Sequence, residues 1–330
     1  MYKNFYKLTR SPFDLTPDPA CFVPTERHNE ALAALYYGIC RHKGVVVVTG
    51  EVGTGKTLML RCLLQLFKES SETSYAYLFN CRLSALEFLQ YTAADFGLRV
   101  GEHQNKSILL LELSRYVTSR GLKGLTTVLV VDEAHNLSME LLEEIRLLSN
   151  LETNDDKLLQ IVLVGQPELD LKLDSFELRP LKQRIALRAH LTPLDEQDTA
   201  RYISERLATA GAAAGGEALF TPEAVKAVHR YSRGFPRLIN TICENALITG
   251  YAQQMASITQ EVILGIATDF HLTTNGSRIG KNPQNETDQK LEHAKNFFLD
   301  LYAATQREDV QDQELKRPFV VEAGKHESDI

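Results

Sequence analysis

The sequence predicts an α/β fold, a parallel sheet covered by helices on both faces, followed by an all-helical domain. Two observations carry this prediction. Short apolar runs alternate with amphipathic helical patterns up to Pro193, as in a parallel sheet with crossover helices. Beyond Pro193 only helical patterns follow, with capping residues at their starts and glycines near their ends. The chain is therefore expected to fold as a sheet domain and a smaller helical domain.

The first predicted strand runs directly into a glycine-rich loop. Residues 45–57 read VVVVTGEVGTGKT, and four consecutive β-branched residues favour a strand buried on both faces. The loop fits the pattern G-x-x-x-x-G-K-[ST], in which backbone N–H groups surround phosphate oxygens. Lys56 is predicted to reach the β- and γ-phosphates, and the Thr57 hydroxyl to hold Mg²⁺. The alternative is a plain glycine-rich turn before a helix. The predicted nucleotide-binding residues are Gly50, Glu51, Val52, Gly53, Thr54, Gly55, Lys56 and Thr57.

Residues 1–25 precede this loop and are rich in aromatic residues and proline, so they cannot form one long helix. We expect them to wrap over the core, where their aromatic rings either line a purine pocket or pack as a plain arm. From Thr25, the run ERHNEALAALYYGIC predicts a helix that ends near Gly44, before the first strand.

Four further apolar runs predict the rest of the sheet, and amphipathic segments between them predict its helices. The predicted strands are 74–80, 126–133, 158–164 and 185–191, and the predicted helices are 58–67, 84–96, 107–120 and 138–148. The helical domain is predicted from segments 195–211, 222–232, 236–252 and 259–270. Beyond Thr274 the chain becomes polar. Within that tail, residues 291–302 cluster apolar side chains on one helical face, for docking a partner or for packing on the core.

Two acids end the strand predicted at 126–133. Asp132 would lie at the carboxyl end of a buried strand, where open α/β sheets bind ligands, and can hold Mg²⁺. Glu133 can accept a proton from an attacking water molecule. The alternative is that these acids cap a helix. The letters DEAH also match an RNA-helicase box, but such helicases need two motor cores, so His135 is interpreted as a packing or capping residue.

Polar residues after the next strands complete the predicted site. Gln166 is placed to hydrogen-bond a γ-phosphate or to orient the water, with a simple turn before Pro167 as the alternative. Arg179, Arg184 and Arg188 are candidates for an arginine that acts on the γ-phosphate of a neighbouring subunit, or for structural ion pairs. Arg237 opens a predicted helix, where the helix dipole disfavours a cation, so a phosphate contact is expected there.

The composition is that of an ordinary globular protein of about two domains: 330 residues, 44% hydrophobic and 24% charged. A net charge of −7 argues against a wholly basic nucleic-acid binder. The five cysteines lack a C-x-x-C pair. Cys62 and Cys243 lie in helical apolar patterns, so buried thiols in a reducing compartment are expected, with no Cys/His metal site. The sequence contains neither a signal-peptide core nor a run of 18 apolar residues. We therefore expect a cytoplasmic protein.

Taken together, the phosphate loop, the two acids, the polar residue after the fourth strand and the Gly-x-Pro-Arg segment resemble the AAA+ ATPases. More narrowly, FYKLTRSPFDLTPDP, GEVGTGKT, VVDEAHNLS, LVGQPEL and LKQRIALRAHLTPL resemble the ExeA/GspA group of secretion ATPases and their relatives in pilus and exopolysaccharide export. The resemblance covers about residues 1–270. It implies Walker A residues Lys56 and Thr57, Walker B residues Asp132 and Glu133, sensor residues Gln166 and Arg237, Arg184 as the best finger, and an adenine side around His28.

The resemblance also implies a domain division and a function. The expected parts are an arm near the adenine site (1–25), the P-loop AAA+ domain (26–193), a helical lid (194–272) and a polar linker and tail (273–330). The expected activity is Mg²⁺-dependent hydrolysis of ATP by a nucleotide-dependent homo-oligomer, with a hexamer as one candidate ring. That activity would power or regulate assembly of a bacterial envelope export system.

Secretion members of the group continue into a transmembrane helix and a peptidoglycan-binding domain, whereas this sequence ends in a short polar tail. We therefore expect a cytoplasmic member that reaches the inner membrane only peripherally, through a partner. The alternative function is an ATP-dependent DNA-binding adaptor of transposition, of the TniB type. A nucleotide-binding scaffold without turnover is disfavoured because Glu133 is intact.

Overall fold

The computed structural model describes residues 1–272 except 17, 80, 102–103, 154–155 and 213–218. The predicted docking helix at 291–302 and the tail that contains it lie outside the described residues. Within them, every predicted strand and helix is present, with ends within two residues of the prediction; the exception is the helix after Thr25, which ends at Cys40 rather than near Gly44. The predicted fold class is confirmed, whereas the division into four parts stays a prediction.

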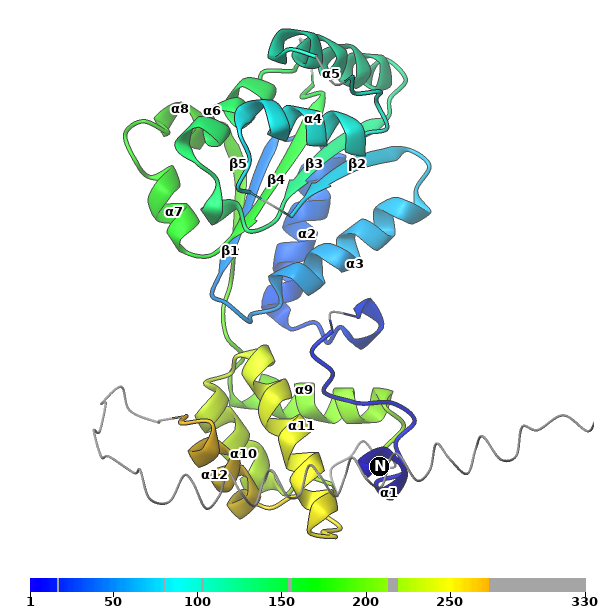
Figure 1. Ribbon diagram of the computed structural model, residues 1–330, viewed down its shortest axis with the longest axis vertical. Helices are drawn as coiled ribbons and strands as arrows, with labels where there is room; N and C mark the ends of the chain where they lie inside the picture. Colours follow the sequence, from blue (N-terminus) through cyan, green and yellow to red (C-terminus); the bar gives the residue numbers. More distant parts are fainter. Residues whose placement is uncertain (17, 80, 102–103, 154–155, 213–218, 273–330) are drawn as a thin grey trace, which may run out of the picture. The chain divides into compact units, whose positions relative to one another are not determined.

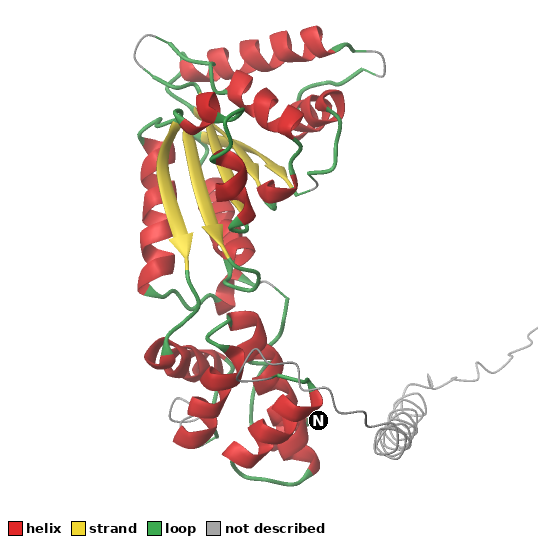
Figure 2. Cartoon of the chain, turned by 90° about the vertical axis from the view of Figure 1, so that its left-hand side faces the viewer, coloured by secondary structure: helices red, strands yellow, loops and turns green. Residues whose placement is uncertain are grey.

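The sheet contains five parallel strands in the order β2-β3-β4-β1-β5 (Figures 1 and 2). All strands point the same way, so their carboxyl ends meet at one edge. The strands are β1 (Val45–Gly50), β2 (Thr73–Leu78), β3 (Thr126–Val131), β4 (Leu159–Gly165) and β5 (Ile185–Leu191).

Helices cover both faces of the sheet (Figure 2). The valines of β1 alternate between two hydrophobic cores, because successive side chains of a strand point to opposite faces. Val46 and Val48 pack into the core under the first two long helices, and Val45 and Val47 into the core on the other face. The first core lies under α2 (Glu26–Cys40) and α3 (Lys56–Glu69); the second lies under α4 (Ala85–Asp95), α5 (Lys106–Gly121), α6 (Met139–Leu148), α7 (Glu168–Leu173) and α8 (Arg179–Lys182).

Four helices form the second part of the fold around a core of their own. They begin where the sequence predicts caps: the Asp195 carboxylate accepts from the backbone N–H of Asp198, and Thr221 caps the next helix. Pro222 and Pro236 occupy first-turn positions. Proline is tolerated there because the N–H that it lacks would have no partner within the helix. The helices are α9 (Glu196–Thr209), α10 (Pro222–Ser232), α11 (Pro236–Ala252) and α12 (Gln260–Asp269).

A glycine fixes how the helical part joins the sheet. Gly234 has a φ of +75°, and a Cβ built on it would lie 1.9 Å from the carbonyl oxygen of Leu194, just after β5. The backbone N–H of Leu194 in turn donates to the Gly234 carbonyl at 2.9 Å. Only glycine fits this close approach of two backbones.

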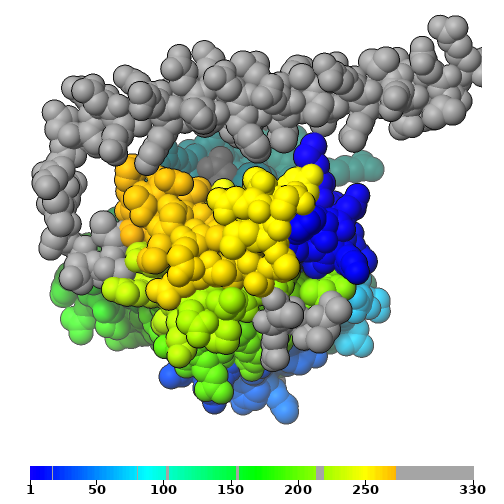
Figure 3. Space-filling view, turned by 90° about the horizontal axis from the view of Figure 1, so that it is seen from below, coloured from blue at the N-terminus to red at the C-terminus, as the bar shows by residue number. Residues whose placement is uncertain are grey.

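The N-terminal arm packs mainly on the helical part rather than on the sheet. Its two short helices, α1 (Tyr2–Phe5) and η1 (Pro19–Cys21), were not predicted. Phe13 is fully buried in the helical core and meets Phe220 edge-on at 6.1 Å. Figure 3 shows the start of the chain beside α11. For Phe13 the structure therefore supports plain packing instead of a purine pocket.

One buried arginine holds the arm in place. Arg206 of α9 donates to the backbone carbonyls of Pro12 (2.5 Å), Cys21 (3.1 Å) and Asp14 (3.2 Å). Its guanidinium also stacks on the Tyr202 ring at 5.7 Å. Since a buried cation needs its donors satisfied, these carbonyls and Arg206 depend on one another.

The burial of the cysteines differs from the expectation. Cys81 and Cys243 are buried, whereas Cys40 is exposed and Cys21 and Cys62 are partly exposed. The expectation of a buried thiol therefore holds for Cys243 and not for Cys62.

Within the described residues, no helix combines the length and the apolar character that a membrane span requires.

Candidate functional site

A cavity of about 390 Å³ opens at the carboxyl edge of the sheet and gathers most of the predicted site residues. It is lined by parts of the fold that are far apart in the chain: the glycine-rich loop, the end of β3, the end of β4, the N-terminal arm and the helical part. Its lining includes Asp14, Leu15, Thr16, Gly53, Lys56, Thr57, Glu133, Gln166, Arg206 and Arg237.

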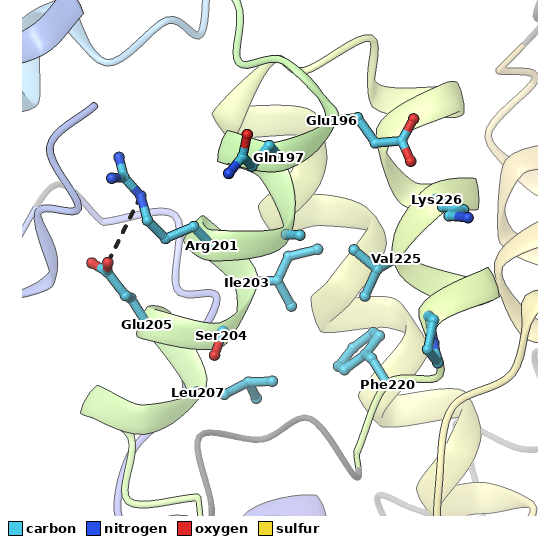
Figure 4. Close-up of a pocket in the computed structure, with 12 residues that line it drawn as sticks. Glu196, Gln197, Arg201, Ile203, Ser204, Glu205, Leu207, Phe220, Val225 and Lys226 are labelled. Carbon is cyan, nitrogen blue, oxygen red and sulfur yellow. Dashed lines mark ion pairs between the residues drawn. The ribbon is translucent and has the colours of Figure 1, made fainter. Parts of the chain in front are cut away.

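A larger cavity of about 970 Å³ lies elsewhere, between α9 and α10 (Figure 4). Apolar side chains such as Ile203, Leu207 and Val225 point into it. It contains neither the glycine-rich loop nor the two acids, so it is separate from the predicted chemistry.

Lys56 begins α3 and turns its side chain back over the loop. The Nζ atom donates to the carbonyl oxygens of Gly50 at 2.7 Å and Glu51 at 2.8 Å. Burial lowers the pKa of Lys56, and the negative charges of Glu133 and Asp132 oppose that shift. The ammonium group is thus held at the mouth of the loop, where phosphate oxygens can replace the two carbonyls.

The start of α11 touches the loop directly. The backbone N–H of Arg237 donates to the Gly53 carbonyl at 3.3 Å, and a Cβ on Gly53 would lie only 3.0 Å from the Arg237 Cβ. Gly53 also has a φ of +83°, so its lack of a side chain permits both the turn and the contact. Arg237 lines the cavity. Its contact with a phosphate stays a prediction.

Asp132 receives three hydrogen bonds that fix its carboxylate. The Thr57 hydroxyl and the Tyr77 hydroxyl each donate to Oδ2 at 3.0 Å, and the Glu133 backbone N–H donates to Oδ1 at 2.9 Å. Burial raises the pKa of Tyr77 and keeps its hydroxyl protonated as a donor. Tyr77 is not among the residues predicted for the site. Its parallel pairing with Val130, two residues before Asp132, is the signal that could have found it.

The oxygen atoms of Thr57 and Asp132 fit a magnesium ion. Mg²⁺ prefers oxygen ligands, and in phosphate sites it takes only one or two from the protein. Magnesium binding by this hydroxyl–carboxylate pair stays a prediction.

Glu133 follows β3 with a strained backbone and an exposed carboxylate. Its φ of +53° and ψ of 34° place it in the left-handed region, which is costly for a residue with a side chain. Its side chain is 42% exposed and lines the cavity. It makes no capping hydrogen bond to the short helix η2 (Ala134–Asn136), and Ser138 caps α6 instead. The helix-cap alternative for the Glu133 side chain is therefore wrong.

Gln166 follows the central strand β4 and lies on the same side of the cavity as Glu133. The two are joined by His135, whose Nδ1 is 3.4 Å from Glu133 Oε2 and whose Nε2 is 3.0 Å from the Gln166 side-chain nitrogen. The prediction treated His135 as a packing or capping residue. The structure places it between the two polar residues of the site.

His28 lies behind the loop instead of in the cavity. Its Nδ1 is 2.7 Å from the Thr25 hydroxyl, and its Nε2 is 2.9 Å from the Thr54 carbonyl oxygen. Burial lowers the pKa of this imidazole, with the Thr54 hydrogen bond opposing the shift. The lining residues from this end of the chain are those of the arm (14–16). A direct contact of His28 with adenine stays a prediction.

The three candidate finger arginines lie outside the cavity of their own chain. Arg188 pairs with Asp170 at 2.9 Å, and Arg184 donates weakly to the Ser149 carbonyl at 3.5 Å. Arg179 stacks on the Phe176 ring at 5.6 Å. A finger must reach a neighbour's nucleotide, so this placement leaves all three as candidates.

Known proteins match this chain in sequence and in fold. Residues 40–173 match the family model described as AAA domain. General secretion pathway protein A of Aeromonas hydrophila is 43% identical over 253 residues, which cover 77% of this chain and 45% of that protein. The chain thus spans less than half the length of this relative.

Three solved structures illustrate the likeness in fold. Drosophila ORC bound to DNA aligns with a TM-score of 0.59 and 21% identity, over 83% of this chain and 69% of that one. Cdc6p from Pyrobaculum aerophilum aligns with a TM-score of 0.58 and 19% identity, over 78% of this chain and 70% of that one. A point mutant of RuvB from Thermotoga maritima aligns with a TM-score of 0.52 and 18% identity, over 78% of this chain and 73% of that one. At these identities the likeness is one of fold.

Proposed function

Because this chain belongs to the ExeA/GspA-like AAA+ ATPases, we propose that it binds ATP with Mg²⁺ and hydrolyses it to ADP and phosphate. The observation that carries the proposal is the 3.0 Å hydrogen bond from the Thr57 hydroxyl to Asp132. It joins the phosphate loop to the acidic end of β3. Glu133, the next residue, lines the same cavity as Lys56.

The proposed reaction is an in-line displacement at the γ-phosphorus. The Glu133 carboxylate accepts a proton from a water molecule as the water oxygen attacks. The bond from the γ-phosphorus to the β,γ-bridging oxygen breaks, and ADP leaves with that electron pair. The exposed carboxylate of Glu133 suits this role, because the water must reach it from the cavity.

The other residues of the site would bind and orient the phosphates. Thr57 and Asp132 would hold a bound Mg²⁺, and the ion would neutralise charge on the β- and γ-phosphate oxygens. Lys56 would exchange its two loop carbonyls for phosphate oxygens. Gln166 and Arg237 both line the cavity and would donate hydrogen bonds toward the γ-phosphate.

The test is Glu133→Gln in the full chain, assayed for ATP turnover and for binding of ATP with Mg²⁺. We expect turnover to fall by roughly 10²–10⁴-fold, because the base is lost while the shape is kept. ATP binding should persist. Glu140→Gln, at an exposed position on α6, is the control and should leave turnover unchanged. Full turnover in Glu133→Gln, or none in the unmodified chain, would refute the assignment.

We further propose that hydrolysis drives or regulates assembly of a bacterial envelope export system, at the cytoplasmic side of the inner membrane. The support is the likeness to general secretion pathway protein A, and the whole of that protein is more than twice as long as the matched part. A nucleotide-dependent homo-oligomer would supply the finger arginine in trans, consistent with the absence of Arg179, Arg184 and Arg188 from their own cavity.

Light scattering of the Glu133→Gln variant tests the proposed assembly. We expect a larger mass with ATP and Mg²⁺ than with ADP. An unchanged monomer mass in ATP would contradict the proposed oligomer. It would not bear on hydrolysis, which the turnover assay tests separately.

A further inference from the structure

We propose that His135 is a positioning residue for the reaction, orienting the Glu133 carboxylate and linking it to Gln166. This inference rests on the proposed ATP hydrolysis and adds a residue to it. In this arrangement the position of Glu133, the proposed base, depends on Gln166, which is proposed to contact the γ-phosphate.

The contacts of the imidazole reach both residues at once. His135 Nδ1 is 3.4 Å from Glu133 Oε2, and Nε2 is 3.0 Å from the Gln166 side-chain nitrogen. The His135 side chain is only 13% exposed, so water competes little for these nitrogens. A partly buried imidazole with both nitrogens close to site residues is poorly explained by packing alone.

The backbone around His135 is held from a separate element. Lys172 of α7 donates through Nζ to the His135 carbonyl at 2.6 Å and to the Leu137 carbonyl at 2.8 Å. Ala134, the preceding residue, is fully buried. The ring is therefore fixed on a rigid support, as a positioning residue needs to be.

The proton of a neutral imidazole can be placed from its neighbours. The Gln166 backbone N–H donates to Nδ1 at 3.4 Å, and Glu133 Oε2 lies 3.4 Å from the same nitrogen, so these two partners favour opposite tautomers. A charged acceptor binds an N–H more strongly than a neutral partner, so the proton belongs on Nδ1. Nε2 then accepts from the Gln166 amide. That amide keeps its second N–H for a phosphate oxygen.

With the proton on Nδ1, these two contacts would connect the phosphate to the base. When Gln166 turns its amide toward a γ-phosphate oxygen, the imidazole stays aligned and presents Nδ1–H to Glu133. The carboxylate is then held by one oxygen, and the other is left for the attacking water. Loss of the imidazole would free Glu133 to rotate without removing any group that binds ATP.

Three substitutions separate the two links. His135→Asn keeps a donor near the Nδ1 position, His135→Gln keeps a polar group near the Nε2 position, and His135→Ala keeps neither. For each full-length variant, kcat, the KM for ATP and the thermal unfolding midpoint are measured. His42→Asn is the matched control, because His42 is also a partly buried histidine beside a carboxylate, Asp156 at 3.8 Å, but precedes β1 at the other edge of the sheet.

We expect His135→Ala to lower kcat by about 10–100-fold, the usual cost of removing a residue that orients a functional group. The KM for ATP should change by less than about twofold, because the phosphate contacts remain. His135→Asn should recover more of kcat than His135→Gln, and His42→Asn should match the unmodified chain. Unchanged kcat in His135→Ala would overturn the inference, as would equal losses in all three variants together with a lowered unfolding midpoint.

A second measurement keeps the inference distinct from the proposed function. Nitrogen NMR of histidine-labelled protein, with the His135 signals assigned by the variant, reports which ring nitrogen carries the proton. We expect Nδ1–H, with a shift of that signal in both Glu133→Gln and Gln166→Ala. A ring protonated on Nε2 and insensitive to Glu133→Gln would overturn the inference whether or not ATP is hydrolysed. Absence of turnover alongside the expected ring signals would refute only the proposed function.

Discussion

The sheet and the helical part supply residues to one cavity by different means. On the sheet side, Lys56, Glu133 and Gln166 each lie within a few residues of the end of a strand. On the helical side, Arg206 and Arg237 reach the cavity through contacts with residues far away in the chain. Arg206 holds the carbonyl of Pro12, 194 residues earlier, and Arg237 meets the loop at Gly53.

This difference separates what a short motif can specify from what only packing can specify. The residues that follow parallel strands all lie at one edge of the sheet, because the strands run in the same direction. Arg206 and Arg237 do not follow strands, so contacts with the backbone of the arm and of the loop must hold them in place. Disturbing those contacts should loosen the helical part and leave the sheet intact.

The largest effect is expected for Gly234→Ala. The new Cβ would lie 1.9 Å from the Leu194 carbonyl oxygen, a backbone atom that cannot move cheaply, and φ there is +75°. We expect the free energy of unfolding to fall by about 3 kcal/mol or more, measured in denaturant. Gly265→Ala in α12 is the control: a Cβ there meets nothing within 4 Å, and the change should stabilise by up to about 1 kcal/mol. Equal effects of the two substitutions would remove the special role of Gly234.

A smaller effect is expected for Arg206→Gln, which leaves three arm carbonyls short of a donor. We expect the free energy of unfolding to fall by about 2 kcal/mol. The KM for ATP should rise with a nearly constant kcat, because residues 14–16 line the cavity. Denaturant unfolding and steady-state kinetics measure both. Arg27→Gln, at an exposed arginine that pairs with Glu30 at 2.9 Å, should change neither. Loosening of the arm would show as faster proteolysis near residue 14. A raised KM with unchanged proteolysis there would contradict the role of Arg206 in holding the arm.

The smallest effect is a pH dependence from Glu244 on α11. Burial raises the pKa of Glu244 above its ordinary 4.5, and the Tyr2 hydroxyl, which donates to it at 2.7 Å, opposes the shift. A raised folded-state pKa means that this group's stabilising contribution is complete below pH 4.5 and is lost as the pH rises through the folded-state value. Comparison of unfolding free energies between about pH 4 and 8 should show a flatter profile for Glu244→Gln than for the unmodified chain. Parallel profiles would show that Glu244 does not contribute.

The residues that could be predicted are those that a local pattern specifies. The loop, the acids after β3 and Gln166 after β4 follow from strand endings and glycine spacing, and the helices follow from periodicity and caps. Tyr77 could not be predicted without the β2–β3 register, because its partner Asp132 is 55 residues away. Arg206, on α9, was counted only as part of a helix. His28 was assigned to the adenine side, whereas its hydrogen bonds lie behind the loop.

The position of β4 between β1 and β3 has a geometric consequence. Neighbouring strands lie about 4.8 Å apart, so the loop after β1 and the acids after β3 start from points roughly 10 Å apart. Were these strands adjacent, the ammonium of Lys56 would meet the carboxylates at ion-pair distance and fill the space between them. Under the proposed function, the intervening strand would leave room for a phosphoryl group and a water molecule between the two charges, and Gln166 follows the end of that strand.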